Sequence, residues 1–227
     1  MIDMTPETKP VATDHRTLVA VERRERTRAK LLRGAIQVFA RHGAEARVID
    51  LVIKQAGVSR GTFYNYFRTN EELFLEVARE VSNEIITIVD PIVLRQQDPA
   101  ASLACGLVSV VRLALINPVL AQFVSKGGPD ALSAGNLTTT VVPREIKGGM
   151  AAGLFTVTDE QLAFDLIFGP VLMAFNAVIN GRASEEYARN LAQAVLQSLG
   201  VDAGRALTYA RLDFDAIAIP ADSIFHC

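Results

Sequence analysis

The sequence predicts an all-α fold in which a small helix-turn-helix domain precedes a larger helical domain. Apolar residues recur at helical spacing through most of the 227 residues, and no strand-like alternation competes with that pattern before residue 213. Glycine, proline and asparagine separate the periodic stretches, as expected for helices joined by short turns. Half of the residues are apolar, so the chain can bury a sizeable core.

The first predicted helix covers residues 25–42. Its apolar residues recur at helical spacing from Leu31 to Ala40, which is typical of an amphipathic helix. Gly43 follows directly and predicts the left-handed residue that ends the helix. Residues 1–24, ahead of this stripe, are expected to form a mobile arm.

A helix-turn-helix is predicted over residues 48–67. The stretch 48–56 reads like a strand by itself, because β-branched residues dominate it, but no second strand follows nearby and Gly57 is a helix stop. Ser59 is then expected to cap a second short helix, with Phe63 four positions into it at the spacing of a hydrophobic staple.

This second helix has two faces of different character. Phe63 and Phe67 lie four positions apart and share the inward face, whereas Gly61, Tyr64 and Asn65 point roughly the opposite way. Half of the aromatic area is therefore core, and half is presented to a partner.

The outward residues suit duplex DNA, since the second helix of a helix-turn-helix lies in the major groove. Arg60 can offer two donors to a guanine, Gly61 lets the backbone approach, and tyrosine hydroxyls can donate to phosphate oxygens. Residues 16–68 carry twelve Lys and Arg against four Asp and Glu, whereas residues 69–227 carry ten against eighteen. A basic segment on an acidic remainder favours a polyanionic partner, although a solvated basic helix would give the same charge.

The segments LLRGAIQVFARHG and QAGVSRGTFYNYFRTNEELF resemble the N-terminal DNA-binding domain of the TetR family of transcriptional regulators, over about residues 25–85. The stretches AGVS and YNYF are the most specific part of this resemblance. It implies that residues 86–227 form a ligand-binding and dimerisation domain. The DNA contacts expected in the reading helix are made by Ser59, Arg60, Gly61, Thr62, Tyr64, Asn65 and Tyr66.

Arg28 of the first helix is expected to add a further DNA contact, together with Arg23, Arg24 and Arg26. Interleaved glutamates leave open an ion-paired helix face at these positions.

Three positions depart from the family pattern. Val48 stands where a capping, phosphate-binding threonine is usual, Ile53 where a small alanine is usual, and Asn70 where a lysine is common. Each missing phosphate contact should weaken DNA binding and flatten its salt dependence by about one unit of slope.

Beyond residue 70, apolar periodicity predicts a fourth helix running toward Asp90 and Pro91. Five more helical stretches follow, at about residues 100–117, 119–124, 137–149, 159–180 and 185–199. The apolar run 162–179 is long enough for a membrane span, but the polar and proline residues within it and a capping box at Thr158 to Gln161 favour a buried helix. The tail from residue 213 is left open between a strand and a loose segment.

The resemblance implies a dimer in which the helices at 159–180 and 185–199 form a four-helix bundle with a second copy. The interface is expected to include Gly169, Leu172, Ala174, Asn176, Leu191 and Val195. The resemblance also implies a pocket for a small apolar effector. Its expected lining is Leu107, Val111, Arg112, Phe123, Met150, Phe155, Phe164, Phe168 and Met173, with Gln122 and Asp165 as further polar anchors.

The function expected from these features is a cytoplasmic, homodimeric repressor that binds a palindromic operator and is released by a small molecule. No catalytic triad, phosphate-binding glycine loop or metal-ligand spacing is evident, so neither an enzyme nor a metal or cofactor is expected. The alternative is a helical ligand- or partner-binding protein whose DNA-reading head has weakened, as Val48, Ile53 and Asn70 suggest.

Overall fold

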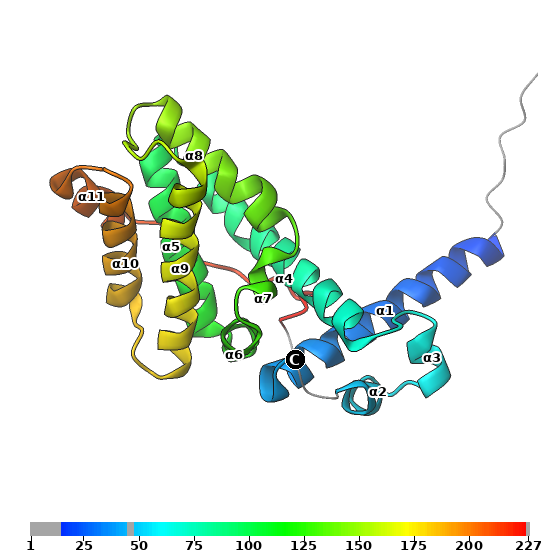
Figure 1. The fold of residues 1–227 in the computed structure, drawn as a ribbon. Helices are drawn as coiled ribbons and strands as arrows, with labels where there is room; N and C mark the ends of the chain where they lie inside the picture. The colour runs from blue at the N-terminus through cyan, green and yellow to red at the C-terminus, as the bar shows by residue number, and fades with distance from the viewer. Residues whose placement is uncertain (1–14, 45–47, 226–227) are drawn as a thin grey trace, which may run out of the picture.

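The computed structural model describes residues 15–44 and 48–225, and the regular structure within them is entirely helical, as predicted (Figure 1). The head contains α1 (His15–His42), α2 (Ile49–Ala56), α3 (Arg60–Tyr64) and the first half of α4 (Asn70–Val93). The larger domain contains the rest of α4 and α5 (Pro99–Ile116), α6 (Pro118–Gly127), α7 (Asp130–Ser133), the π-helix η1 (Leu137–Val141), α8 (Val142–Ala151), α9 (Glu160–Ile179), α10 (Glu185–Ser198) and α11 (Ala203–Ala210).

Helix α1 begins at His15 and not at Glu25, so the prediction of an arm through residue 24 is wrong for residues 15–24. The side chains of residues 18–26 are exposed, and this part of the helix projects beyond the head in Figure 1. Burial of apolar side chains therefore does not explain why these residues are helical. Good helix formers and opposite charges four apart, as at Glu22 and Arg26, favour a helix that an apolar stripe does not reveal. Residues 1–14 of the predicted arm lie outside the described residues.

The turns of the head follow the glycines. Gly43 has φ 82° after α1, and Gly57 has φ 65° between α2 and α3, a conformation that favours glycine at both positions. Gly34 serves α1 differently, because a side-chain Cβ there would lie 3.3 Å from the backbone nitrogen of Ala56. A bare glycine thus lets α2 pack closely on α1.

Polar caps begin most of the helices of the larger domain. Asp98, Asn117, Asp159, Ser184 and Asp202 each accept backbone N–H groups at the start of their helices.

Two details of these caps differ from expectation. The cap of α9 is Asp159, so the capping box predicted from Thr158 is wrong by one residue. Helix α11 was not predicted, since its eight residues carry only a short apolar pattern behind Asp202.

The tail that follows α11 is neither a strand nor loose. Phe214, Ile224 and Phe225 are buried, and the side-chain amide of Asn117 donates to the Phe225 carbonyl at 3.0 Å. The Arg33 guanidinium of α1 donates to the Asp222 carbonyl at 2.6 Å. Figure 1 shows the tail crossing the larger domain and ending beside α1, so it fastens the head to that domain.

An aromatic cluster forms a second connection between head and larger domain. Phe39 of α1 meets Phe74 of α4 edge to face with ring centroids 5.2 Å apart, and Phe123 of α6 lies 5.5 Å from Phe74. Lys126, also on α6, donates to the Arg41 carbonyl at 2.6 Å. Phe123 was predicted to line the ligand pocket. Its place is instead this junction, where it is fully buried.

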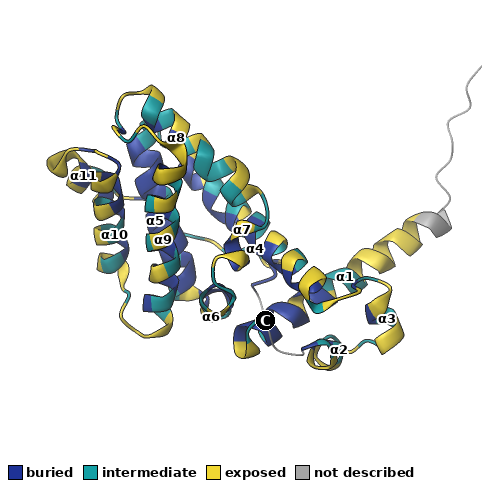
Figure 2. Ribbon diagram, in the orientation of Figure 1, coloured by how far each residue is buried: buried dark blue, intermediate teal, exposed yellow. Residues whose placement is uncertain are grey.

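Two helices of the described chain, α5 and α9, are long and apolar enough to span a membrane by length and composition alone. Most of α5, 67%, is buried inside the fold, which identifies it as a core helix. Only 28% of the α9 window is buried, and the exposed residues of α9 appear as yellow segments in Figure 2. Helix α9 therefore presents an apolar face that this one chain leaves uncovered.

Candidate nucleic-acid interface and ligand cavity

The outer face of α3 carries most of the predicted DNA-contacting residues. Ser59, Arg60, Gly61 and Asn65 are exposed, and Tyr64 keeps 46% of its surface open, while Thr62 is half-buried. A Cβ added at Gly61 would meet nothing nearer than the Ser59 hydroxyl at 3.9 Å. Packing within the chain therefore does not require glycine there, which is consistent with a need for space on the outer side.

The inner side of the reading helix makes it rigid. Phe63 is fully buried and Phe67 nearly so, as predicted, and their ring centroids lie 6.0 Å apart. Phe63 also meets Tyr64 edge to face at 5.4 Å, so the exposed ring is oriented by a buried one. The Ser59 hydroxyl accepts the Thr62 N–H at 3.0 Å, which is the predicted N-cap. A helix of five residues is held by these contacts and not by its length.

Arg60 has a partner within the head. Its guanidinium donates to the Asp50 carboxylate of α2 at 2.9 Å, and both side chains are mostly exposed. Exposed pairs of this kind contribute less than about 1 kcal/mol, so a guanine edge or phosphate can replace the carboxylate. The pair holds Arg60 in place across the turn between α2 and α3.

The remaining predicted DNA-contacting residues are less free. Tyr66 is half-buried and its hydroxyl donates to the Arg24 carbonyl at 3.2 Å. Arg28 pairs with Glu76 and, at 3.9 Å, with Glu80, both on α4. The ion-paired alternative therefore applies at Arg28, whose guanidinium joins α1 to α4.

The three departures from the family pattern have structural consequences. Val48 is fully buried at the start of α2 with no side-chain cap, so it has no access to phosphate. Ile53 packs half-buried against the core of the head. The Asn70 amide donates to the Ala44 carbonyl at 2.7 Å, which ties α4 to the end of α1. Asparagine is neutral, so this position brings no positive charge to the DNA.

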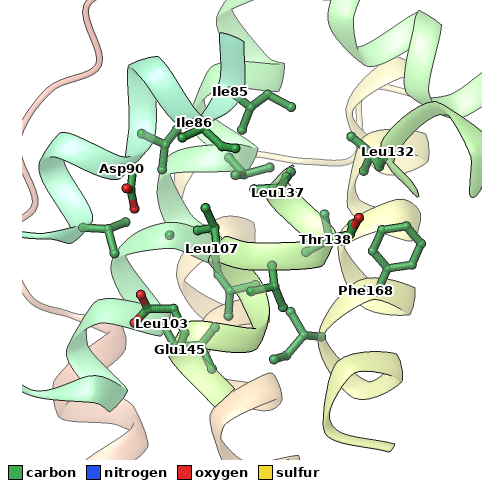
Figure 3. A pocket seen from close by; sticks show the side chains of 18 of the residues that line it. Ile85, Ile86, Asp90, Leu103, Leu107, Leu132, Leu137, Thr138, Glu145 and Phe168 are labelled. Carbon is green, nitrogen blue, oxygen red and sulfur yellow. The ribbon is translucent and has the colours of Figure 1, made fainter. Parts of the chain in front are cut away.

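A cavity of about 80 Å³ lies inside the larger domain between α4, α5, α7, η1, α8 and α9 (Figure 3). Of the nine residues predicted to line a pocket, Leu107 and Phe168 do so. Most of the wall is aliphatic. The lining side chains that the prediction missed are mainly Ile85, Ile86, Val89, Asp90, Val93, Leu103, Val110, Leu132, Leu137, Thr138, Val141, Val142, Glu145, Ile167 and Val171.

The other predicted pocket residues lie elsewhere. Arg112 donates to Glu185 at 2.8 Å and to the Phe214 carbonyl at 3.3 Å, and Glu185 has its pKa lowered by this guanidinium. Met173 is 61% exposed on the surface of α9, so its assignment to the pocket is wrong. Phe155 is buried against Gly149, where any side chain would collide with its ring.

Val111 and Met150 do not line the cavity either. Val111 is buried in the core, and Met150 is half-buried. Phe164 lines a neighbouring hollow, and its ring stacks on that of Phe168 with centroids 5.1 Å apart. Of the further anchors, Asp165 is exposed and accepts the Gln161 amide at 3.0 Å, and Gln122 is half-buried on α6.

The exposed face of α9 is not quite the one that was predicted. Ala174 and Val195 are buried within the chain, so they face its own core. Gly169 is exposed, whereas Leu172, Asn176 and Leu191 are half-buried. The outward apolar side chains are Leu162, Leu166, Pro170 and Met173 of α9, with Leu191 and Ala194 of α10 beside them.

Profiles of one protein family match both parts of the chain. The profile described as "Bacterial regulatory proteins, tetR family" matches residues 31–77, and "Tetracyclin repressor-like, C-terminal domain" matches residues 98–211. The first match contains α2 and α3, and the second contains most of the cavity wall.

Individual relatives agree with these matches. The "HTH-type transcriptional repressor AcnR" of Corynebacterium glutamicum is 32% identical over 73 residues, which are 32% of this chain and 39% of AcnR. The "Fatty acid metabolism regulator protein" of Bacillus subtilis is 25% identical over 160 residues, covering 63% and 78% of the two chains. The chain thus matches well under half of the length of AcnR.

Solved structures extend the likeness to the whole fold. RolR without ligand is 27% identical with a TM-score of 0.69, covering 84% of this chain and all of the RolR chain. RolR in complex with resorcinol gives a TM-score of 0.68 and covers 89% of this chain. The similarity therefore includes both the head and the domain that holds the cavity.

Proposed function

The chain belongs to the TetR family of transcriptional regulators, and from this premise we propose that it is a cytoplasmic, homodimeric repressor, released from a palindromic operator by a small molecule. It is a transcriptional regulator with a helix-turn-helix domain. The observation that carries the rest of the proposal is the outer face of α3, where polar residues and a bare glycine stand exposed on a rigid aromatic base.

In the proposed complex, α3 enters the major groove with its N-terminal residues toward the bases. Arg60 exchanges Asp50 for a guanine, and Asn65 reads a neighbouring base edge. Gly61 allows close approach, while Ser59, Thr62 and Tyr64 contact phosphates. Tyr66 adds a phosphate contact if its hydroxyl leaves the Arg24 carbonyl.

Positive charge near α3 supports this arrangement. The exposed part of α1 carries Arg23, Arg24 and Arg26, and it projects from the head in Figure 1. These arginines can pair with phosphates that Val48 and Asn70 do not reach. Arg28 has no part in the proposal, because Glu76 and Glu80 already neutralise it.

Dimerisation is proposed through the uncovered faces of α9 and α10. Leu162 is 50% exposed and Met173 61%, and both lie on one stripe of α9 with Leu166 and Pro170. Exposed Gly169 would let a second helix approach closely, since a Cβ there meets nothing within 4 Å. A two-fold pair of subunits would present two reading helices to half-sites about 34 Å apart.

The repressor role is supported by the name of AcnR, and the small-molecule input by the ligand in the RolR complex. Helix α4 offers a physical route between input and output. Its residues Ile85, Val89 and Val93 line the cavity, and Phe74 near its other end packs on Phe39 of the head. A ligand that favours a different position of α4 would shift the spacing of the two heads.

A second candidate is a helical ligand- or partner-binding protein with a weakened reading head. Burial of Val48 and the hydrogen bond that the Asn70 amide already makes to the Ala44 carbonyl favour it, because both reduce the phosphate contacts that the head can make. The two candidates differ in whether duplex DNA binds tightly.

Selection from random duplexes, followed by titration of the selected fragment, tests the proposal. We expect a nanomolar dissociation constant, two or four chains per duplex, and a loss of at least about a hundredfold in affinity between 50 and 200 mM salt. Absent or salt-insensitive binding would favour the weakened-head candidate. Chains that remain monomeric at micromolar concentration would contradict the dimer.

A further inference from the structure

The cavity of the larger domain has an apolar end and a charged end. Figure 3 shows Asp90 and Glu145 on one side of it, with the Phe168 ring on the opposite side. The walls between are aliphatic side chains of α4, α5 and η1. Such a division suits a ligand that has one polar end.

Both carboxylates of the charged end share one arginine. The Arg144 guanidinium donates to Asp90 at 2.6 and 3.3 Å and to Glu145 at 2.8 Å. Asp90 and Glu145 side chains are only 17% and 12% exposed, whereas Arg144 is 39% exposed. The carboxylates therefore lie between the cavity and the arginine, which is on the solvent side.

The charges of this cluster do not cancel. Two carboxylates and one guanidinium leave a net charge of −1 beside an apolar space, where electrostatic interactions are stronger than in water. Each carboxylate has about four acceptor sites and donates nothing when ionised, so both retain sites for another donor. An anionic ligand would meet uncompensated negative charge, while a hydroxyl or ammonium group would find acceptors.

The other polar groups at the cavity fit the same chemistry. The Thr138 hydroxyl already donates to the Ser133 carbonyl at 3.1 Å, so it faces a ligand as an acceptor. The Ser102 hydroxyl, which also lines the cavity, donates to the Gln96 carbonyl at 3.5 Å. Outside the lining, the Ser82 hydroxyl accepts the Leu137 N–H at 3.1 Å and fixes the start of η1 against α4. Within the described chain, the donors that reach the charged end come from Arg144, on the side away from the cavity.

The size of the cavity limits the ligand further. Its volume of about 80 Å³ is roughly half of an engineered 150 Å³ apolar cavity that binds benzene. A single ring therefore requires side chains of the wall to shift, and a long acyl chain would require a much larger rearrangement. The wall includes η1, a π-helix, and such helices are frequent where a fold must adjust at a functional site.

We propose that the effector cavity selects compact, ring-sized molecules that donate hydrogen bonds to Asp90 and Glu145 and carry no negative charge. This inference rests on the proposed function for its biological meaning, but the binding preference is a property of the cavity itself. Asp90 and Glu145 are the residues that determine the specificity, and Arg144 sets the charge that they present.

Three ligands that share one ring and differ in their polar group test the inference: benzyl alcohol, protonated benzylamine and benzoate. At ten times the dissociation constant, a ligand that binds the folded state should raise the Tm of the full-length protein by about 3 °C. We expect this shift from benzyl alcohol or benzylamine, and binding at least tenfold weaker from benzoate.

The double variant Asp90→Asn with Glu145→Gln changes the cluster from −1 to +1. It should bind benzoate at least tenfold more tightly than the wild type does and lose its preference for benzylamine. The matched control is Asp213→Asn, which removes an exposed carboxylate from the tail after α11 and should keep the wild-type order of affinities for the three ligands. If the double variant does not fold, each single variant should still reduce the difference between the dissociation constants of benzoate and benzyl alcohol.

The inference is overturned if benzoate binds the wild type as tightly as benzyl alcohol and benzylamine do, or if none of the three ligands binds. It is also overturned if the Asp90 and Glu145 variants rank the three ligands by affinity as the wild type does. Titration of the same preparations with a selected duplex separates this result from the proposed function. Duplex binding without ligand binding would refute the cavity chemistry alone. Ligand binding in the expected order without duplex binding would refute the proposed regulator and leave the cavity chemistry standing.

Discussion

The proposed reading surface is formed by neighbours in the sequence, from Ser59 to Tyr66, on α3 and the residues beside it, over a buried phenylalanine pair. The cavity is lined by residues from Ile85 to Val171 that come from helices across the larger domain. A surface of the first kind depends on a local cap, a turn glycine and a staple, whereas a cavity depends on how whole helices pack. The two regions should therefore respond differently to substitution.

Phe63→Ala should produce the largest difference between them. Removing a fully buried phenylalanine costs about 3–5 kcal/mol, and here the loss falls on the base of α3. We expect duplex binding to disappear while benzyl alcohol still raises the Tm of the larger domain. Tyr64→Phe, which keeps the exposed ring and removes only its hydroxyl, serves as the control and should fold normally. Loss of ligand binding together with DNA binding would show that the two regions do not respond separately.

Phe225→Ala tests the tail that joins the regions. Phe225 is 4% exposed and its carbonyl accepts from the Asn117 amide, so we expect a loss of about 3 kcal/mol in the free energy of unfolding. In urea unfolding, this variant should have a lower midpoint urea concentration than the wild type, with little change in the m-value. Ala218→Gly, at an exposed tail position, is the control for effects of the tail backbone. An unchanged midpoint would mean that the tail contributes no stability.

Arg60→Ala should weaken operator binding by about 1–3 kcal/mol, roughly five- to 150-fold, without altering stability. The side chain is 64% exposed, and its ion-pair partner within the described chain is the exposed Asp50. Fluorescence anisotropy with the selected duplex measures the change. The control is Arg182→Ala, which removes an exposed arginine of the larger domain and should leave the affinity for the duplex unaltered. An equal loss of affinity in both variants would mean that Arg60 acts through the net charge of the protein and not through a contact in the groove.

Asp50→Ala should have a smaller effect, and in the opposite direction. It removes a negative charge beside α3 and frees Arg60, so duplex binding should strengthen by less than about 1 kcal/mol. The gain should shrink as salt rises, because exposed charges are screened. Weaker binding in the variant would instead mean that Asp50 positions Arg60 for DNA.

The smallest expected effect concerns pH. Arg112 lowers the pKa of Glu185 below its usual 4.5, so the pair contributes stability above that value and loses it as the pH falls further. The Tm values of Glu185→Gln and wild type should therefore differ above pH 5 and converge as the pH falls below the lowered pKa of Glu185. A constant difference at all pH values would contradict an ionic contribution.

The family, the all-α fold and the inward and outward faces of α3 could be predicted from the sequence, because capping, glycine turns and four-residue spacing are local. Local patterns also predicted most helices of the larger domain. They missed residues 15–24 of α1, where helix propensity acts without an apolar stripe.

Placement within the larger domain was less predictable. Leu107 and Phe123 both lie on apolar helical faces, yet one lines the cavity and the other packs at the junction with the head. Met173 and Ala174 are neighbours, and only the packed fold shows which is exposed. A polar residue within an apolar stripe was the available signal for Asp90, which follows Ile85 and Val89 on α4.

Whether α3 reads DNA is tested most directly by the consensus that wild type and Arg60→Ala each select from random duplexes. We expect a two-fold symmetric consensus for the wild type, with one position in each half-site relaxed in the variant. Identical consensus sequences, or none in either selection, would contradict a role for α3 in reading DNA.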